Sequence, residues 1–208
     1  MQIELFNAVG SPVKATGLWD GSTRIVEAHG RYHDAVARGN CYTVSDTAGR
    51  TQPAGLSTAP IAVTLYNPLG SGVFLSLLYA AANELVAWPA TAICWVGINP
   101  TGSVASTGTA LAPQNCNGTG SVGKVKPLTT ATLPAVPTIF ADLGVGLTGA
   151  ITVTTQAGLF RWFDGILGVG PGGALSIQVS TVSGSSGLAA TWIWEEVPQS
   201  GSGAALAA

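Results

Sequence analysis

The chain has 208 residues, a length that one domain with extensions can fill. Only 9% of the residues are Asp, Glu, Lys or Arg, 47% are apolar, and the formal net charge is -2. Because nucleic-acid binding needs clustered Lys and Arg, and the eight cations are scattered along the sequence, we expect no nucleic-acid partner. So little charge favours a surface that partner proteins cover in part.

No segment predicts secretion or membrane insertion. Residues Met1–Phe6 lack the basic start of a signal peptide, and Gly10-Ser11-Pro12 interrupts the apolar run behind them. The longest later apolar stretch, Val73 to Ala82, has about half the length that a membrane span requires. We therefore expect a soluble protein that is made in a cytoplasm.

The first 57 residues mix charges, glycines and short apolar pieces without a sustained period. Ten of the eighteen charged residues lie in residues 1–50. Only Ile25 to Arg38 could form a helix, and Gly30 weakens that helix. The sequence predicts an extended N-terminal arm with short strands over residues 1–57, and the charge-rich residues 1–50 are the part expected to reach a second partner.

The arm contains the sharpest candidate for a metal site. His29 and His33 are the only histidines, and a helix would place both imidazoles on one face with Asp34 nearby as a third ligand. Gly30 inside the segment and the missing HExxH glutamate count against this reading. We expect surface or interface histidines and no metal site.

Three widely spaced cysteines follow, with no CxxC pair that would indicate zinc or redox chemistry. Free cysteine is commonly buried, and a cytoplasm keeps thiols reduced. We expect buried free thiols at Cys41, Cys94 and Cys116, and the sequence leaves open whether one pair forms a disulfide.

From Pro60 onward, runs of β-branched, aromatic and Leu residues alternate with clusters of Gly, Pro, Asn and Ser, which is the pattern of strands and turns. The two clearest predicted hairpins pair 61–66 with 73–79 and 172–182 with 188–197. In the second, Leu175, Ile177 and Val179 alternate with Ser176, Gln178 and Ser180. This period of two predicts one face on the core and one facing solvent or a neighbour.

Further strands are expected near 91–98, 136–142, 150–155 and 158–163. Gly102 to Gly123 and Lys126 to Pro137 are expected to form long loops or β-edge segments. Many short strands at this spacing predict an all-β fold, an antiparallel β-sandwich of jelly-roll type over residues 58–199. Residues 200–208 predict a flexible tail.

Motifs that could carry enzyme chemistry fail in their context. Gly168–Gly173 spells GxGxxG, but a strand rather than a helix is expected after it. Gly118–Val125 nearly spells a P-loop, yet Val125 replaces the hydroxyl residue that would hold magnesium. Glu195 and Glu196 are neighbours on one strand and so point to opposite faces. We expect no catalytic residues, no cofactor and no enzymatic activity.

Six tryptophans stand at positions 19, 88, 95, 162, 192 and 194. Trp192 and Trp194 share one strand face, as do Phe160 and Trp162. Aromatic faces suit both protein contacts and sugars, and we favour anchors of the core and of subunit interfaces. A carbohydrate- or receptor-binding surface, with Trp162 and Trp194 as its candidate contacts, is the alternative.

Three segments carry a likeness to a known class of proteins. Arg38–Ser45, Asn67–Gly72, and the stretch from Pro171–Leu175 to Trp194–Glu196 resemble small virion proteins of tailed bacteriophages, above all capsid decoration (cement) proteins. The resemblance runs from about residue 36 to 198, and residues 1–35 match no part of it.

The resemblance implies a β-sandwich, commonly a homotrimer, on the exterior of the capsid. Such a protein binds its own copies and the lattice of the major capsid protein, and thereby stabilises the particle. The alternative becomes a carbohydrate- or receptor-binding module of a phage head fibre or tail. Thr51 to Gly123 contains a single charged residue, Glu84, and is the predicted core and subunit interface.

Overall fold

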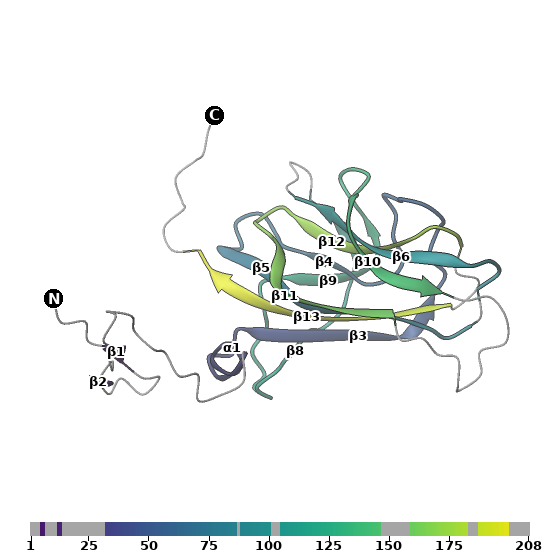
Figure 1. Ribbon diagram of the computed structural model, residues 1–208. Coiled ribbons are helices and arrows are strands. Elements are labelled where there is room, and N and C mark those ends of the chain that lie inside the picture. The colour runs from purple at the N-terminus through teal and green to yellow at the C-terminus, as the bar shows by residue number, and fades with distance from the viewer. Residues whose placement is uncertain are drawn as a thin grey trace, which may run out of the picture.

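The computed structural model describes residues 5–6, 12–13, 32–86, 88–100, 105–146, 159–182 and 187–199. Most of their strands form two antiparallel sheets that pack face to face around the larger of two apolar clusters (Figure 1). The predicted all-β sandwich is therefore confirmed. The elements in chain order are β1 (Leu5–Phe6), β2 (Pro12–Val13), α1 (His33–Ala37), β3 (Cys41–Arg50), β4 (Thr64–Tyr66), β5 (Val73–Glu84), β6 (Ala92–Asn99), β7 (Thr107–Ala110), β8 (Gln114–Asn115), β9 (Lys126–Thr132), β10 (Thr138–Gly146), β11 (Leu159–Val169), β12 (Ala174–Val179) and β13 (Leu188–Pro198).

The strands divide between a five-stranded and a six-stranded sheet. The five-stranded sheet has the order β11-β5-β13-β3-β8, and the six-stranded sheet has the order β10-β6-β12-β4-β9-β7. Strands β1 and β2 pair only with each other. The single helix of the described residues, α1, is far too short to cross a membrane, and none of them forms a helix that could.

Strand β13 supplies the largest side chains of the core. Its residues alternate between the two faces, so that Trp192 and Trp194 point inward and are fully buried. The indole nitrogen of Trp192 donates to the carbonyl of Val63, 2.9 Å away, which satisfies its one polar group. Tyr42 of β3 stacks on Trp194 with 5.9 Å between the ring centroids. Aromatic packing between the sheets thus dominates this end of the core.

Both predicted hairpins are wrong in their pairing. Strands β4 and β5 belong to different sheets, and so do β12 and β13. Each connection therefore passes from one sheet to the other and does not form a hairpin. Strand β12 pairs with β4 and β6, and β13 pairs with β3 and β5. The alternation of apolar residues shows which side chains of a strand point to the core. The same alternation is found whether two successive strands pair in one sheet or pack against each other from different sheets.

The prediction that the polar residues of the segment 172–182 meet solvent or a neighbour holds for the exposed Ser180 and is wrong for Ser176 and Gln178. Ser176 and Gln178 are fully buried, because the connection between β3 and β4 covers them. The amide of Gln178 accepts a hydrogen bond from the backbone of Ser57 at 2.9 Å, and Gln52 donates to the carbonyl of Ile177 at 2.9 Å. The polar face therefore binds the chain itself.

The N-terminal range divides into two parts. Strand β3, although predicted to belong to the arm, is an inner strand of the five-stranded sheet between β13 and β8. Helix α1 covers the end of the predicted helix Ile25 to Arg38, and residues 25–31 lie outside the described residues.

Other predicted segments fall as follows. Strands β6, β10 and β11 overlap the segments predicted near 91–98, 136–142 and 158–163. The stretch Gly102 to Gly123 contains β7 and β8, each at the edge of a sheet, whereas β9 lies one strand further in. The predicted strand at 150–155 and the tail 200–208 are outside the described residues.

The side chain of Asn67 stabilises the connection between β4 and β5. Its buried side chain donates to the carbonyls of Val73 and Val169 at 2.9 and 3.1 Å and accepts a hydrogen bond from the hydroxyl of Ser71 at 2.6 Å. One amide thereby joins the corner to the end of β11. Pairs of buried carbonyls need such a donor, because leaving them without one costs free energy.

We expect Asn67→Ala to lower the free energy of unfolding by about 2–4 kcal/mol, because it leaves two carbonyls without their donor. Urea denaturation followed by tryptophan fluorescence measures this. Asn83→Ala, at an exposed position of β5, is the matched control and should change stability by less than about 0.5 kcal/mol. Equal losses in the two variants would contradict the role of Asn67.

Candidate interaction surface

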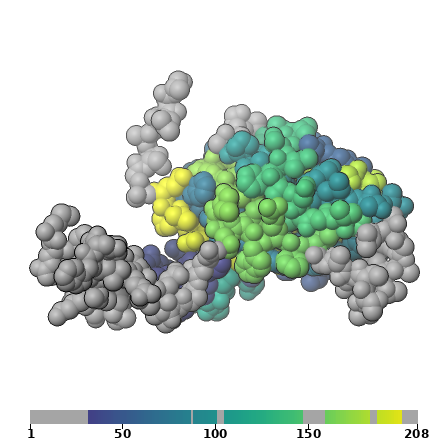
Figure 2. Space-filling model, viewed as in Figure 1, coloured from purple at the N-terminus to yellow at the C-terminus, as the bar shows by residue number. Residues whose placement is uncertain are grey.

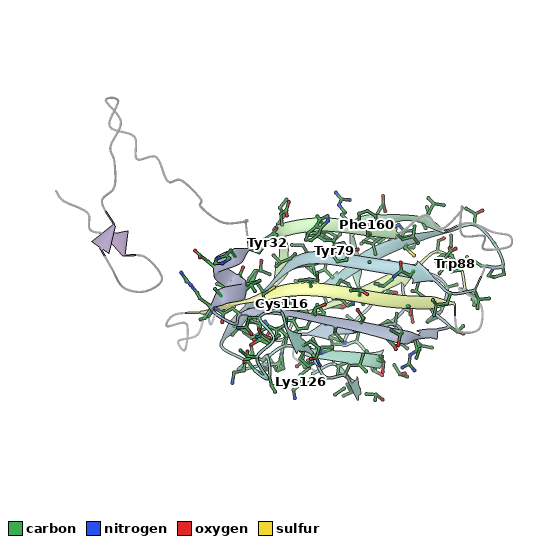
Figure 3. All side chains as sticks on the ribbon, turned by 90° about the horizontal axis from the view of Figure 1, so that it is seen from below. Tyr32, Tyr79, Trp88, Cys116, Lys126 and Phe160 are labelled. Carbon is green, nitrogen blue, oxygen red and sulfur yellow. The ribbon has the colours of Figure 1, made fainter. Side chains whose placement is uncertain are left out.

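Three aromatic side chains gather on the outer face of the five-stranded sheet, at its β11 edge. Trp162 of β11 lies directly opposite Tyr79 of β5, with 4.8 Å between the ring centroids. Phe160, two residues earlier on β11, lies diagonally from Tyr79 at 6.1 Å. We call Tyr79, Phe160 and Trp162 the aromatic triad; Figure 3 looks onto this sheet and labels Tyr79 and Phe160.

Two rings of the aromatic triad are open to solvent, and the third, that of Tyr79, is half-buried. Phe160 is 55% exposed and Trp162 is 53% exposed, although burial of such rings is normally favourable. Their neighbours across the sheet are uncharged: Ile193 lies opposite Tyr79, and Thr191 bonds to Ser45 through their hydroxyls at 2.9 Å. The face therefore offers ring surface and hydroxyl groups.

Strand β11 bulges immediately after the aromatic triad. The register jumps between Trp162 and Leu167, and Asp164 and Gly165 both adopt positive φ, at 51° and 81°. The bulge leaves Ile166 82% exposed. The hydroxyl of Tyr32, just before α1, donates to the carboxylate of Asp164. The segment that enters α1 is thus fastened beside the aromatic triad.

More apolar side chains lie on β10, the neighbouring edge of the other sheet. Val145 lies directly opposite Ile93 of β6, and both are exposed. Strands β10 and β11 adjoin where the two sheets meet at this side: Arg161 donates to the carbonyl of Asp142 at 3.3 Å. Figure 2 shows the atoms of the two strands side by side on the face toward the viewer.

Exposed apolar or aromatic side chains thus flank both sheets along one side of the sandwich. We call this set the β10–β11 surface. Its exposed members are Ile93, Ile139, Phe140, Val145, Phe160, Trp162 and Ile166, and the half-buried Tyr79 lies among them. Such a concentration of exposed apolar side chains commonly marks a contact with another molecule.

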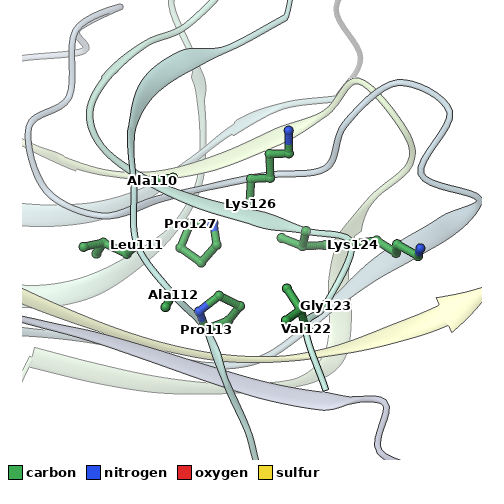
Figure 4. Close-up of a pocket in the computed structure, with 10 residues that line it drawn as sticks. Ala110, Leu111, Ala112, Pro113, Val122, Gly123, Lys124, Lys126 and Pro127 are labelled. Atoms are coloured by element: carbon green, nitrogen blue, oxygen red, sulfur yellow. The ribbon is translucent and has the colours of Figure 1, made fainter. Parts of the chain in front are cut away.

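An open cleft of about 450 Å³ lies elsewhere, between the segment after β7 and the segment before β9 (Figure 4). Its walls are mostly apolar, and Lys124 and Lys126 stand on it with diverging side chains. Beneath it, the buried carboxylate of Glu196 accepts hydrogen bonds from the backbone of Lys124 and Val125, both at 2.8 Å. These amides of the P-loop-like segment are therefore already bound to a carboxylate of the protein.

The predicted metal-site residues are only partly visible. His33 and Asp34 are exposed, with 3.8 Å between Nδ1 and Oδ1, and His29 lies outside the described residues. Within the described ranges, no three His, Cys, Asp or Glu side chains gather as metal ligands would. Glu195 and Glu196 point to opposite faces, with Glu196 in the interior.

Trp162 and Trp194, paired in the sequence as candidate sugar contacts, are separated by the structure. Trp194 is fully buried and cannot meet a ligand, whereas Trp162 is exposed. The sequence pattern missed Tyr79, because alternation along β5 places it on the same face as Leu75 and Leu77. A register shift opposite the step from Ile193 to Trp194 turns Tyr79 outward instead.

Comparison with protein-family models, with curated proteins and with solved structures finds no match for the chain.

Trp162 and Trp192 should differ strongly in their contributions to the free energy of unfolding. We expect Trp192→Ala to lower the free energy of unfolding by about 3–5 kcal/mol, because removal of the indole leaves a large cavity in the core. Trp162→Ala should cost less than about 1 kcal/mol, since the ring is largely in water. Urea denaturation of both variants checks this. A large loss at Trp162 would mean that the ring serves the fold and is no open contact site.

Proposed function

We propose that this chain is a non-enzymatic structural virion protein that decorates a phage capsid, binding its own copies and the major capsid protein lattice on the capsid exterior. The observation that carries the proposal is the β10–β11 surface, with exposed apolar side chains on both sheets at one side of the sandwich. Only 9% of the residues are charged, so the chain has few charges that would keep a monomer with this exposed apolar surface soluble. Covering the surface with a partner protein would remove it from water.

The order of the strands supports a jelly-roll connectivity. A jelly roll forms when a long hairpin of eight strands folds over itself, so that its first strand pairs with its last, its second with its seventh, and so inward. Here β3 pairs with β13, β4 with β12, β5 with β11, and β6 with β10. Strands β7, β8 and β9 are additions between β6 and β10. Jelly rolls are frequent in viral capsid and lectin domains.

The β10–β11 surface fits a second copy of the chain better than a charged partner. Two of the charged side chains on these strands already bind within the chain: Arg161 donates to the carbonyl of Asp142, and Asp164 accepts from the hydroxyl of Tyr32. Burying several aromatic and aliphatic side chains in one contact provides the anchors that dominate interface energies. Many modest contacts of this kind, repeated over a capsid, add up to strong stabilisation. The N-terminal arm, fastened through Tyr32 to Asp164, would reach the second partner.

The oligomeric state tests this directly. We expect the purified chain to be a homotrimer by light scattering and sedimentation velocity. Changing Phe160 and Trp162 together to Ser should weaken self-association at least about 30-fold, because both rings leave the contact. Leu69→Ser is the matched control, since Leu69 is 56% exposed on the corner between β4 and β5.

Binding to particles is the second part of this experiment. The wild-type chain should cosediment with capsids assembled without it, and the Phe160 and Trp162 double variant should not. A wild-type chain that is monomeric and leaves such capsids unbound would refute the proposal.

A second candidate function is binding of carbohydrate, as in a head fibre or tail module. It is favoured by the aromatic triad on β11 and β5, since the same sheet carries the hydroxyls of Thr191 on β13 and Ser45 on β3. Sugars stack on aromatic faces through their C–H groups and hydrogen-bond to hydroxyls at the rim. In this reading the rings meet a ligand instead of a second copy.

A glycan array separates the two functions. If the aromatic triad binds sugar, Trp162→Ala and Tyr79→Ala should each reduce the signal at least about tenfold, with Leu69→Ala unchanged as control. If no glycan binds and the trimer dissociates in the Phe160 and Trp162 double variant, the carbohydrate-binding function is contradicted and the structural function is supported.

A further inference from the structure

Two of the three cysteines lie on paired segments at the end of the five-stranded sheet. Strand β8 pairs with β3 so that Asn115 lies opposite Tyr42 and Gln114 lies opposite Thr43. One step further, Cys116 lies opposite Cys41, and the backbone N–H of Cys116 donates to the carbonyl of Cys41 at 2.9 Å. Side chains at opposed positions share a face of the sheet.

The spacing of such a pair suits a covalent bond between the sulfurs. Directly opposed residues at hydrogen-bonded positions have Cα atoms about 5.5 Å apart, within the range of about 4.4–6.8 Å found for disulfides. Cys116 is also among the groups that raise the pKa of Cys41, as expected for two thiols that lie near each other. We propose that Cys41 and Cys116 are an oxidative modification site that forms an intramolecular disulfide. This inference does not depend on the proposed function.

Formation of the bond needs only a small movement. The Cβ atoms of residues opposed at a hydrogen-bonded position are about 5.5 Å apart, so they must approach by about 1–2 Å to reach disulfide geometry. Strand β8 can supply this shift, because it has two residues and stands at the sheet edge. Strand β3 stays in place, held along its other side by β13.

The two thiols have different access to an oxidant. Cys116 is exposed and Cys41 is buried, and both are free thiols in the structure. Burial, the neighbouring Cys116 and the nearby Glu195 raise the pKa of Cys41 to about 12. Cys116 is therefore the residue that meets a small oxidant first, and Cys41 is the residue that resolves the intermediate.

The oxidant is a low-molecular-weight disulfide such as glutathione disulfide. The Cys116 thiolate attacks one of its sulfurs, forms a mixed disulfide and releases one thiolate. Cys41 then loses its proton, attacks the sulfur of Cys116 and releases the second thiolate. The two cysteines lose two electrons together, the small disulfide gains them, and two small thiols are the products.

The disulfide would lie where α1 leads into the first strand of the sandwich. Beside the pair, the amide of Asn115 donates to the carbonyl of Gly39 at 2.6 Å, and the backbone of Glu196 donates to Asn40 at 2.8 Å. Figure 3 shows Cys116 close to α1. A covalent bond would therefore tie the segment that follows β8 to the start of β3, directly behind α1.

Cys94 serves as the internal reference. It lies on β6 in the interior, with no exposed surface, and burial together with the charge of Glu84 raises its pKa to about 12. It lies opposite Val179 and Gly144 on the neighbouring strands. It should stay reduced when the other two cysteines are oxidised.

The test uses the full chain, purified with reductant and then incubated with glutathione disulfide at pH 8. Remaining thiols are alkylated after unfolding, and intact mass and peptide mapping locate the modifications. We expect a product lighter than the reduced chain by two hydrogens before alkylation, with only Cys94 alkylated. Its melting temperature should rise by about 5–10 °C, since the bond closes a long loop.

Two variants make the result decisive. Cys94→Ala should keep both the cross-link and the rise in melting temperature. Cys116→Ser should lose both, with Cys41 and Cys94 alkylated. Three alkylated thiols in the wild-type chain, a stable glutathione adduct on Cys116, or disulfide-linked dimers would each overturn the assignment.

Discussion

The fold depends on how β13 lies in the middle of the five-stranded sheet. Its inward face carries Trp192 and Trp194, which fill the core, and then Glu196, whose carboxylate binds the backbone before β9. Both of its neighbours, β3 and β5, take their register from it. A slip by one residue would turn both indoles to solvent and bury Glu195, so the aromatic core fixes the pairing of the sheet.

The bulges decide which side chains remain for contacts. The register shift between β5 and β13 turns Tyr79 outward, and the bulge after Trp162 lifts Ile166 away from the core. Without these irregularities, simple alternation would spread the apolar side chains differently over the two faces. The outward orientation of Tyr79 and the exposure of Ile166 therefore arise from local departures from regular pairing.

The class of fold could be read from the sequence because runs of β-branched and aromatic residues between turn clusters report strands directly. Pairing could not, since β4 and β5 show the same alternation whether they are neighbours or face each other. Phe160 and Trp162 were recognised as sharing one face, but nothing in the sequence separated exposed Trp162 from buried Trp194. That distinction depends on the face of the sheet, because Trp162 lies on the outer face and Trp194 points into the core.

The bulge of β11 also limits how copies of the chain can join. An edge strand normally offers a row of free backbone groups that another chain can extend as a continuous sheet, and such growth has no natural end. Here Asp164 and Gly165 break that row with positive φ, and the side chain of Asp164 is tied to Tyr32. A further strand added at this edge would therefore meet an interrupted row of backbone groups, which disfavours growth of the sheet into fibres.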